Sequence, residues 1–196
     1  MLAWINFAVL IFATLFFLYF YFLSTGPAAL ERVIGPDAYR RCAQYRVVAM
    51  VLEFVTVACY VVYRFYPLPT PLPDSFPWPW WVSGLIAAVI GIPTTLLMII
   101  GVKDAGEEAL VPKKEHTMYG GIYTRIRHPQ AAGEAFGWLW IAFLLHSPFL
   151  VIFSLVYFPI LLIMSWAEEH DLLLRYGDAY ADYWKRTGAF WPKTRP

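Results

Sequence analysis

The chain has 196 residues, of which 60% are hydrophobic and only 15% are charged, whereas soluble domains are about 45–50% apolar and about 25% charged. This composition excludes an ordinary soluble domain and predicts an integral membrane protein. The formal net charge is +1, and no basic stripe rises above the flanks of the apolar runs, which argues against a nucleic-acid partner.

The N-terminal half contains three apolar runs, and a helix that spans a bilayer needs about 20 mostly apolar residues. The first run, Leu2–Leu23, is uncharged and has no preceding lysine or arginine, so we interpret it as a transmembrane helix rather than a secretory signal. The second, Val47–Tyr63, is shorter and carries Glu53, and the third, Trp80–Val102, is a full span. Residues 1–102 are therefore predicted to form three transmembrane helices.

Two further apolar runs, Ala131–Leu145 and Phe149–Trp166, are separated only by His146, Ser147 and Pro148. So short a connection predicts an antiparallel helical hairpin. The predicted fold is all-α, a polytopic integral membrane protein with five transmembrane helices that include this C-terminal hairpin. Because the first arm is short for a full crossing, a four-span alternative, in which the hairpin only dips into the bilayer, stays open.

The distribution of lysine and arginine predicts the orientation, since these residues concentrate in cytoplasmic loops. With five spans, fourteen of the fifteen fall on one side, and only Arg64 falls on the other. The N-terminus is therefore predicted outside, and the C-terminus inside. Residues 103–196 are expected to comprise a cytoplasmic loop, the hairpin and a cytoplasmic tail, forming one structural unit with the first three helices.

Polar side chains gather at the cytoplasmic ends of the hairpin. The stretch YTRIRHPQAAGE leads into the first arm, and MSWAEEHD ends the second. Because the connection between the arms is short, the start of one lies beside the end of the other. We therefore expect Arg127 and His128 to lie close to Glu168 and Glu169, at the membrane–water boundary.

The residue types narrow the chemistry available to this cluster. Four histidines, one of them at the opposite end of the hairpin, are too few for a membrane di-iron enzyme, and no HExxH motif indicates zinc. No GxSxG motif indicates a hydrolase. Group transfer from a bound, already activated cofactor needs only binding and orienting groups, and fits best. We expect no metal.

The stretch GGIYTRIRHPQ, the apolar hairpin, Glu168–Glu169 and RYGDAYADYWKRTGAFWP together resemble the isoprenylcysteine carboxyl methyltransferase family. The resemblance covers roughly the last ninety residues and is greatest to small prokaryotic members. It implies a membrane enzyme with S-adenosylmethionine as methyl donor and a lipid-modified cysteine carboxylate as acceptor. The membrane would be the cell membrane of a prokaryote or the endoplasmic reticulum of a eukaryote, with the active site on the cytoplasmic side.

The resemblance also implies which residues hold the donor. These are Glu115, His116, Thr117, Met118, Tyr123, His128, Pro129, Gln130, Ala131 and Glu168. The chain has no strand followed by a GxGxxG turn, so a Rossmann-type site is not indicated.

The roles follow from the chemistry of a sulfonium methyl donor. A carboxylate acceptor, with an ordinary pKa of about 4, is already ionised and needs no general base. An amine acceptor must first lose a proton, which makes Glu134 or His128 a candidate base. Glu168 would receive the donor's amino group, and His128 with nearby backbone N–H groups would hold its carboxylate. Arg127 would orient a carboxylate of the Glu168–Glu169 pair, so Arg127 and Glu168 are the candidate catalytic residues.

Two positions are expected to face the acceptor. Eukaryotic members of the family place a substrate-receiving arginine four residues before the glutamate pair, and Met164 stands there in this chain. Glu134 begins the first hairpin arm, and charged residues inside a bilayer are candidates for function; a structural hydrogen bond is an equal alternative. Glu53 is interpreted as a paired or neutral structural residue.

We therefore expect a membrane methyltransferase whose amphiphilic acceptor enters from the bilayer. A phospholipid or amine N-methyltransferase is the closest alternative. A non-catalytic membrane scaffold is the alternative from another class, and a transporter is disfavoured because the sequence shows no internal repeat. The sequence does not indicate an oligomeric state.

Overall fold

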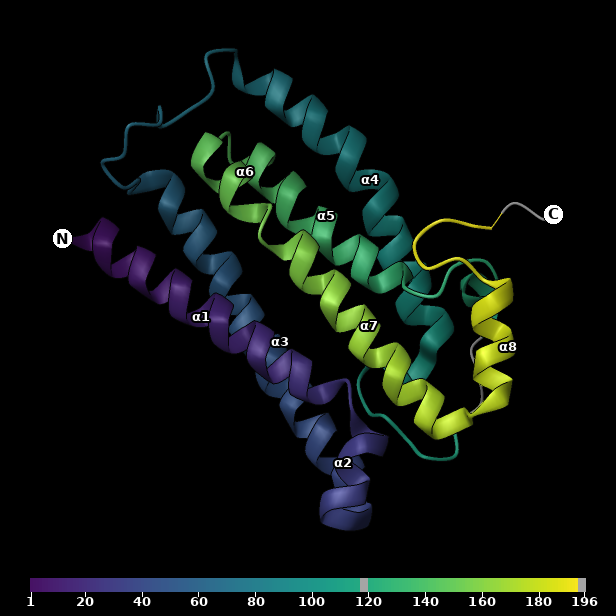
Figure 1. The fold of residues 1–196 in the computed structure, drawn as a ribbon. Helices are drawn as coiled ribbons and strands as arrows, with labels where there is room; N and C mark the ends of the chain where they lie inside the picture. Colours follow the sequence, from purple (N-terminus) through teal and green to yellow (C-terminus); the bar gives the residue numbers. More distant parts are fainter. Residues whose placement is uncertain (117–119, 194–196) are drawn as a thin grey trace.

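The computed structural model describes residues 1–116 and 120–193, and its regular structure is helical throughout (Figure 1). In chain order, the α-helices are α1 (Leu2–Ser24), α2 (Pro27–Ile34), α3 (Ala38–Phe65), α4 (Trp80–Ala105), α5 (Pro129–Leu144), α6 (Pro148–Ser154), α7 (Tyr157–Tyr176) and α8 (Asp178–Arg186). Three 3₁₀-helical turns join them, at Gly35–Asp37 (η1), Gly106–Ala109 (η2) and Gly121–Thr124 (η3). The prediction of an all-helical chain is confirmed for these residues.

Four helical stretches are long and apolar enough to cross a membrane. They are Leu2–Ser24, Pro27–Phe65, Trp80–Ala109 and Pro148–Tyr176. Their outer surfaces are apolar as well: Phe12, Phe54, Val89 and Leu162 are 62%, 68%, 68% and 52% exposed. Helices that are hydrophobic all round belong in an apolar solvent, where their backbone groups are satisfied internally. The fold therefore supports a membrane protein.

The helix boundaries differ from the predicted ones at the second helix and in the second hairpin arm. The second helix begins at Ala38 rather than Val47. The first hairpin arm is short, as predicted, because α5 has 16 residues and a crossing needs about 20. The second arm is divided into α6 and α7 at Leu155–Val156. Pro159 explains this division, because a proline in a helix has no N–H and its ring clashes with the carbonyl four residues earlier.

The helices pack as two pairs with α7 between them. Helix α1 lies along α3, α4 lies along α5, and α7 contacts α1, α2, α5 and α8. Gly133 allows α5 to approach α4 closely, because a Cβ there would lie 2.7 Å from the Met98 Cβ and 3.0 Å from the Thr94 carbonyl oxygen. Aromatic rings fill the centre: Trp138 stacks on Tyr157 at 4.6 Å and meets Tyr60 at 5.3 Å between ring centroids.

The two ends of the molecule differ in charge. Figure 1 shows α2, α8, the C-terminal ends of α4 and α7 and the N-terminal end of α5 at one end, which we call the basic end. The N-terminus, the segment 66–79 and α6 lie at the other. Among the described residues, Arg64 alone of the lysines and arginines belongs to the far end. The boundary predicted at residue 102 falls within α4, and the contacts of α7 with α1 and α2 cross it.

Candidate functional site

A cavity of about 280 Å³ lies at the basic end and extends between the helices toward the middle of the molecule. Its volume is close to the lower limit for small-molecule sites, about 300 Å³. Charged and tyrosine side chains line the part near the basic end, and apolar ones line the deeper part, together with Glu53 and Glu134. Apolar lining residues include Phe17, Ala49, Met50, Met98 and Val102; polar ones include Arg46, Glu108, Tyr123, Arg127, His128, Gln130, Glu168, Asp171, Arg175, Tyr180 and Tyr183.

His128 and Pro129 form the corner at which the chain enters α5. Proline at the first helical position needs no hydrogen-bond acceptor, and it keeps the preceding residue out of the helical conformation. The backbone N–H of His128 donates instead to the Ala189 carbonyl at 3.0 Å, and that of Arg127 donates to the Gly188 carbonyl at 2.8 Å. The segment after α8 is thereby attached to the entrance of α5.

His128 connects the two glutamates of α7, as the sequence predicts. Its Nε2 lies 2.8 Å from Glu169 Oε1 and its Nδ1 lies 3.5 Å from Glu168 Oε2, with only 3% of the side chain exposed. Burial disfavours the charged imidazolium, but the hydrogen bonds to both carboxylates outweigh it, so the pKa of His128 is raised above its ordinary value. Both ring nitrogens lie beside these carboxylates, and the predicted contact of His128 with the donor's carboxylate stays a prediction.

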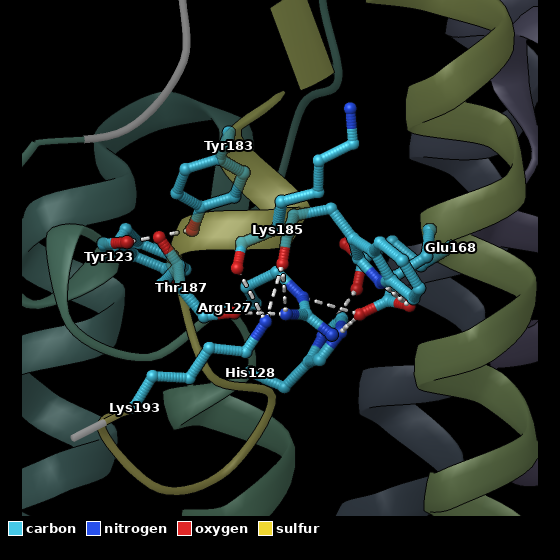
Figure 2. A network of polar contacts seen from close by, with 10 residues as sticks. Tyr123, Arg127, His128, Glu168, Tyr183, Lys185, Thr187 and Lys193 are labelled. Carbon is cyan, nitrogen blue, oxygen red and sulfur yellow. Dashed lines mark hydrogen bonds and ion pairs between the residues drawn. The ribbon is translucent and has the colours of Figure 1, made fainter. Parts of the chain in front are cut away.

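Arg127 donates hydrogen bonds to α7, to α8 and to the residue that follows α8 (Figure 2). Its Nε donates to Glu169 Oε1 at 2.7 Å, which is the predicted contact with the glutamate pair. Its Nη1 donates to the carbonyl oxygens of Trp184, at 3.1 Å, and Thr187. The Trp184 indole N–H donates to the other oxygen of Glu169 at 2.9 Å. Glu169 is therefore surrounded by donors, and Arg127 both contacts Glu169 and lines the cavity.

Glu168 has a different environment from its neighbour. Its side chain is 38% exposed, and it lines the cavity. Glu169 is 12% exposed and does not line it. The helical rotation between consecutive residues of α7 explains this difference, since it points one carboxylate into the cavity and the other toward α8.

Tyr123 and Gln130 form a second polar contact at the cavity wall. Gln130 Nε2 donates to Tyr123 Oη at 2.7 Å, and that hydroxyl donates to the Gly101 carbonyl at 3.2 Å. The hydroxyl of Tyr183 donates to the Tyr123 backbone carbonyl at 2.7 Å, and burial raises the pKa of Tyr183 to about 12. Tyr183 thus positions the loop that carries Tyr123.

Sequence reasoning missed the cluster formed by Arg46, Glu108 and Arg175. Arg175 Nη1 donates to Glu108 Oε1 at 2.6 Å, and both side chains are at most 5% exposed. Arg46 comes from α3, Glu108 from η2 and Arg175 from α7. The sequence shows two consecutive acids, Glu107 and Glu108, just after α4. Their relation to Arg46 and Arg175 was not predictable, because residues so far apart in the chain give no local pattern.

The remaining predicted residues are divided between the cavity and other places. Pro129, Ala131 and Glu134 line the cavity. Glu115 is exposed. His116 Nδ1 lies 3.9 Å from Glu108 Oε2, and the His116 carbonyl accepts from the Tyr176 hydroxyl at 2.5 Å. Thr117 and Met118 lie outside the described residues.

Met164 does not line the cavity in the described part of the chain. It is 4% exposed and belongs to the apolar core between the helices. That Met164 faces the acceptor stays a prediction, which its place in the core does not support. Glu53 and Glu134 line the cavity's deeper part instead and repel each other electrostatically.

Four cavity-lining residues carry a buried polar atom that has no hydrogen-bond partner among the described residues. These atoms are Arg46 Nε, Glu134 Oε1, Arg175 Nε and Tyr180 Oη. Buried polar groups in proteins are nearly always hydrogen-bonded, and each exception needs an explanation. A bound polar ligand would satisfy them.

Comparisons with known proteins add no relative. No family model, no curated protein and no solved structure matches this chain. The functional argument therefore rests on the cavity and its residues.

Proposed function

We propose that this protein is a membrane methyltransferase that uses S-adenosylmethionine and acts on a lipid-like acceptor, with the carboxylate of a prenylated cysteine as the first candidate. The supporting observation is a single cavity that combines two environments. Charged groups and unsatisfied polar atoms line one part, and apolar side chains at the depth of the long helices line the other. A polar donor and an amphiphilic acceptor each find a matching surface there.

The membrane arrangement belongs to the same proposal. Helix α5 would form the fifth crossing, shortened and shielded by α4 and α7, which pack against it. The basic end would face the cytoplasm, since lysine and arginine concentrate on that side. The donor would then reach the cavity from water, and the acceptor from the bilayer.

The donor's polar groups fit the residues at the basic end. Glu168 exposes a carboxylate to the cavity, and Gln130 and Tyr123 contribute an amide and a phenol to its wall. Bound there, the donor would supply a methyl group activated by the sulfonium charge. The protein's part is to orient the two reactants and exclude water, because a carboxylate is less stabilised by hydration in a dry site.

A second candidate function is N-methylation of an amine-bearing lipid. The observation that favours it is the pair Glu53 and Glu134, two acids in the deeper, apolar part of the cavity. Such acids would attract an ammonium group, and Glu134 would accept its proton before the nitrogen attacks the methyl carbon. Methyl transfer would then rise with pH through the pKa of the amine, whereas a carboxylate acceptor predicts no such rise near neutral pH.

Calorimetric titration of the detergent-purified protein with S-adenosylhomocysteine tests the donor site. We expect micromolar binding that weakens at least tenfold in Glu168→Gln. The control is Asp74→Asn, which changes an exposed carboxylate outside the cavity. Absence of binding in detergent and in bilayer nanodiscs would contradict the proposal and favour a non-catalytic scaffold. Transfer of labelled methyl to a prenylcysteine or to an aminophospholipid would then identify the acceptor.

A further inference from the structure

Arg46 is a cavity-lining arginine whose hydrogen bonds within the described chain all go to backbone carbonyls. It projects from α3, and its Nη1 donates to the carbonyl oxygens of Glu108 at 2.6 Å and Ala109 at 3.1 Å. Its Nη2 donates to the Ser24 carbonyl at 3.3 Å. These bonds fix the guanidinium plane without neutralising its charge.

Two donors remain on Arg46. An arginine side chain has five N–H donors, and three are used by the carbonyls. Of the other two, one is on Nε, which is buried and has no hydrogen-bond partner among the described residues, and one is on Nη2. The edge made by Nε and Nη2 is one that binds a carboxylate through two parallel hydrogen bonds.

Arg46 also differs from the other buried arginines in its charge balance. Arg127 is paired with Glu169 and Arg175 with Glu108. In residues 1–116 and 120–193 no carboxylate lies within 4.0 Å of the Arg46 guanidinium nitrogens. Arg46 is partly buried, and a charge partly removed from water without a counter-charge is unfavourable, so an anionic group in the cavity would be attracted to it.

Glu168 provides the complementary charge in the same cavity. It comes from α7, its one ion pair among the described residues is with His128 Nδ1 at 3.5 Å, and it interacts electrostatically with Arg46. An acid and an arginine that are both incompletely paired match the two charges of an α-amino acid, one ammonium and one carboxylate. The amino-acid end of S-adenosylmethionine has this chemistry, and its carboxylate needs a partner, since both ring nitrogens of His128 lie beside glutamates.

We propose that Arg46 is the residue that binds a ligand carboxylate in this cavity, with Glu168 receiving the ammonium of the same amino-acid group. The inference rests on the proposed function, in which the donor supplies that group. A free carboxylate on the acceptor would present the same chemistry to Arg46. The two sources are separated by the ligand that is titrated.

The test compares ligands that differ only in the carboxylate. Wild-type protein is titrated calorimetrically with S-adenosylhomocysteine and with its decarboxylated analogue, which keeps the adenosine and the amine. We expect the analogue to bind about 30-fold more weakly, which corresponds to about 2 kcal/mol at about 1.4 kcal/mol per tenfold change. In Arg46→Gln the two should bind alike. Arg46→Lys should restore only part of the difference, because an ammonium has no flat edge for a carboxylate.

The controls separate binding from folding. Arg41→Gln changes an exposed arginine of the same helix and should leave both affinities unchanged. Unchanged affinity of Arg46→Gln for the decarboxylated analogue shows that the cavity is intact. If the wild type binds both ligands equally, the donor's carboxylate is not the group that Arg46 binds. This result requires no variant.

The acceptor is tested in the same way, with an S-prenylated N-acetylcysteine and its carboxamide. A preference for the acid that disappears in Arg46→Gln would support the carboxylate site and assign it to the acceptor. The assignment of Arg46 as the carboxylate-binding residue would be wrong in two cases: if neither the donor nor the acceptor shows a preference for the carboxylate, or if the preference persists in Arg46→Gln. In both cases donor binding itself would remain established. No binding of S-adenosylhomocysteine would overturn the proposed function, and the acceptor titration would then decide the role of Arg46 alone.

Discussion

Two arginines that line the same cavity differ in their hydrogen bonding: Arg127, at the corner before α5, and Arg46, in the cavity wall formed by α3. At the corner, Arg127 is bound to Glu169, Trp184 and Thr187, and His128 bridges two carboxylates. At the wall, Arg46 and Arg175 each have an Nε with no hydrogen-bond partner in residues 1–116 and 120–193. A complete network maintains the structure, whereas an incomplete one has groups left for a ligand.

The largest effect expected from this comparison is on stability at the corner. Arg127→Ala would remove the ion pair with Glu169, which keeps only His128 and Trp184 beside it in the described chain, and would take a donor from the Thr187 carbonyl. Breaking a buried ion pair costs about 3–5 kcal/mol. Arg127 and Glu169 side chains are 7% and 12% exposed. Denaturant unfolding in detergent measures the loss. The control Arg125→Ala changes an exposed arginine two residues earlier and should have little effect; equal losses in both variants would refute the distinction.

A smaller effect is expected from the pH dependence of His128. Because the pKa of His128 is raised in the folded protein, its stabilisation is complete below the unfolded pKa, about 6.5, and disappears as pH rises through the folded pKa. The wild type should therefore lose its stability advantage over His128→Gln above about pH 6.5, by about 1.4 kcal/mol for each unit of pKa difference. Unfolding measured across this range would contradict the assignment if the advantage grew with pH.

Two tyrosines of α8 provide the smallest and sharpest comparison. Tyr183→Phe removes the hydroxyl that donates to the Tyr123 carbonyl, and should cost about 1 kcal/mol of stability. Tyr180→Phe removes a buried hydroxyl that has no partner in the described chain, and should cost almost none. If the Tyr180 hydroxyl contributes to ligand binding, Tyr180→Phe should instead lower the affinity for S-adenosylhomocysteine a few-fold. A stability loss in Tyr180→Phe equal to that in Tyr183→Phe would contradict this division.

Part of the site was predictable because its residues belong to one local pattern. Arg127 and His128 lie next to Pro129, which begins α5, and the short connection to α6 brings Glu168 and Glu169 back to them. The pairings of His128 with both glutamates, and of Arg127 with Glu169, follow from that pattern. Which glutamate faces the cavity does not, because it depends on the rotation of α7 about its axis.

The composition and the spacing of apolar runs determined that this is a helical membrane protein whose basic residues gather at one end. Those features are local, since each helix satisfies its own backbone and its length is written in consecutive residues. The tertiary structure alone decided that Arg46, Glu108 and Arg175 meet, that Met164 lies in the core and that Glu53 joins Glu134 in the cavity. These contacts join segments distant in the chain, and they depend on how closely α3, α5 and α7 pack, which no local pattern specifies.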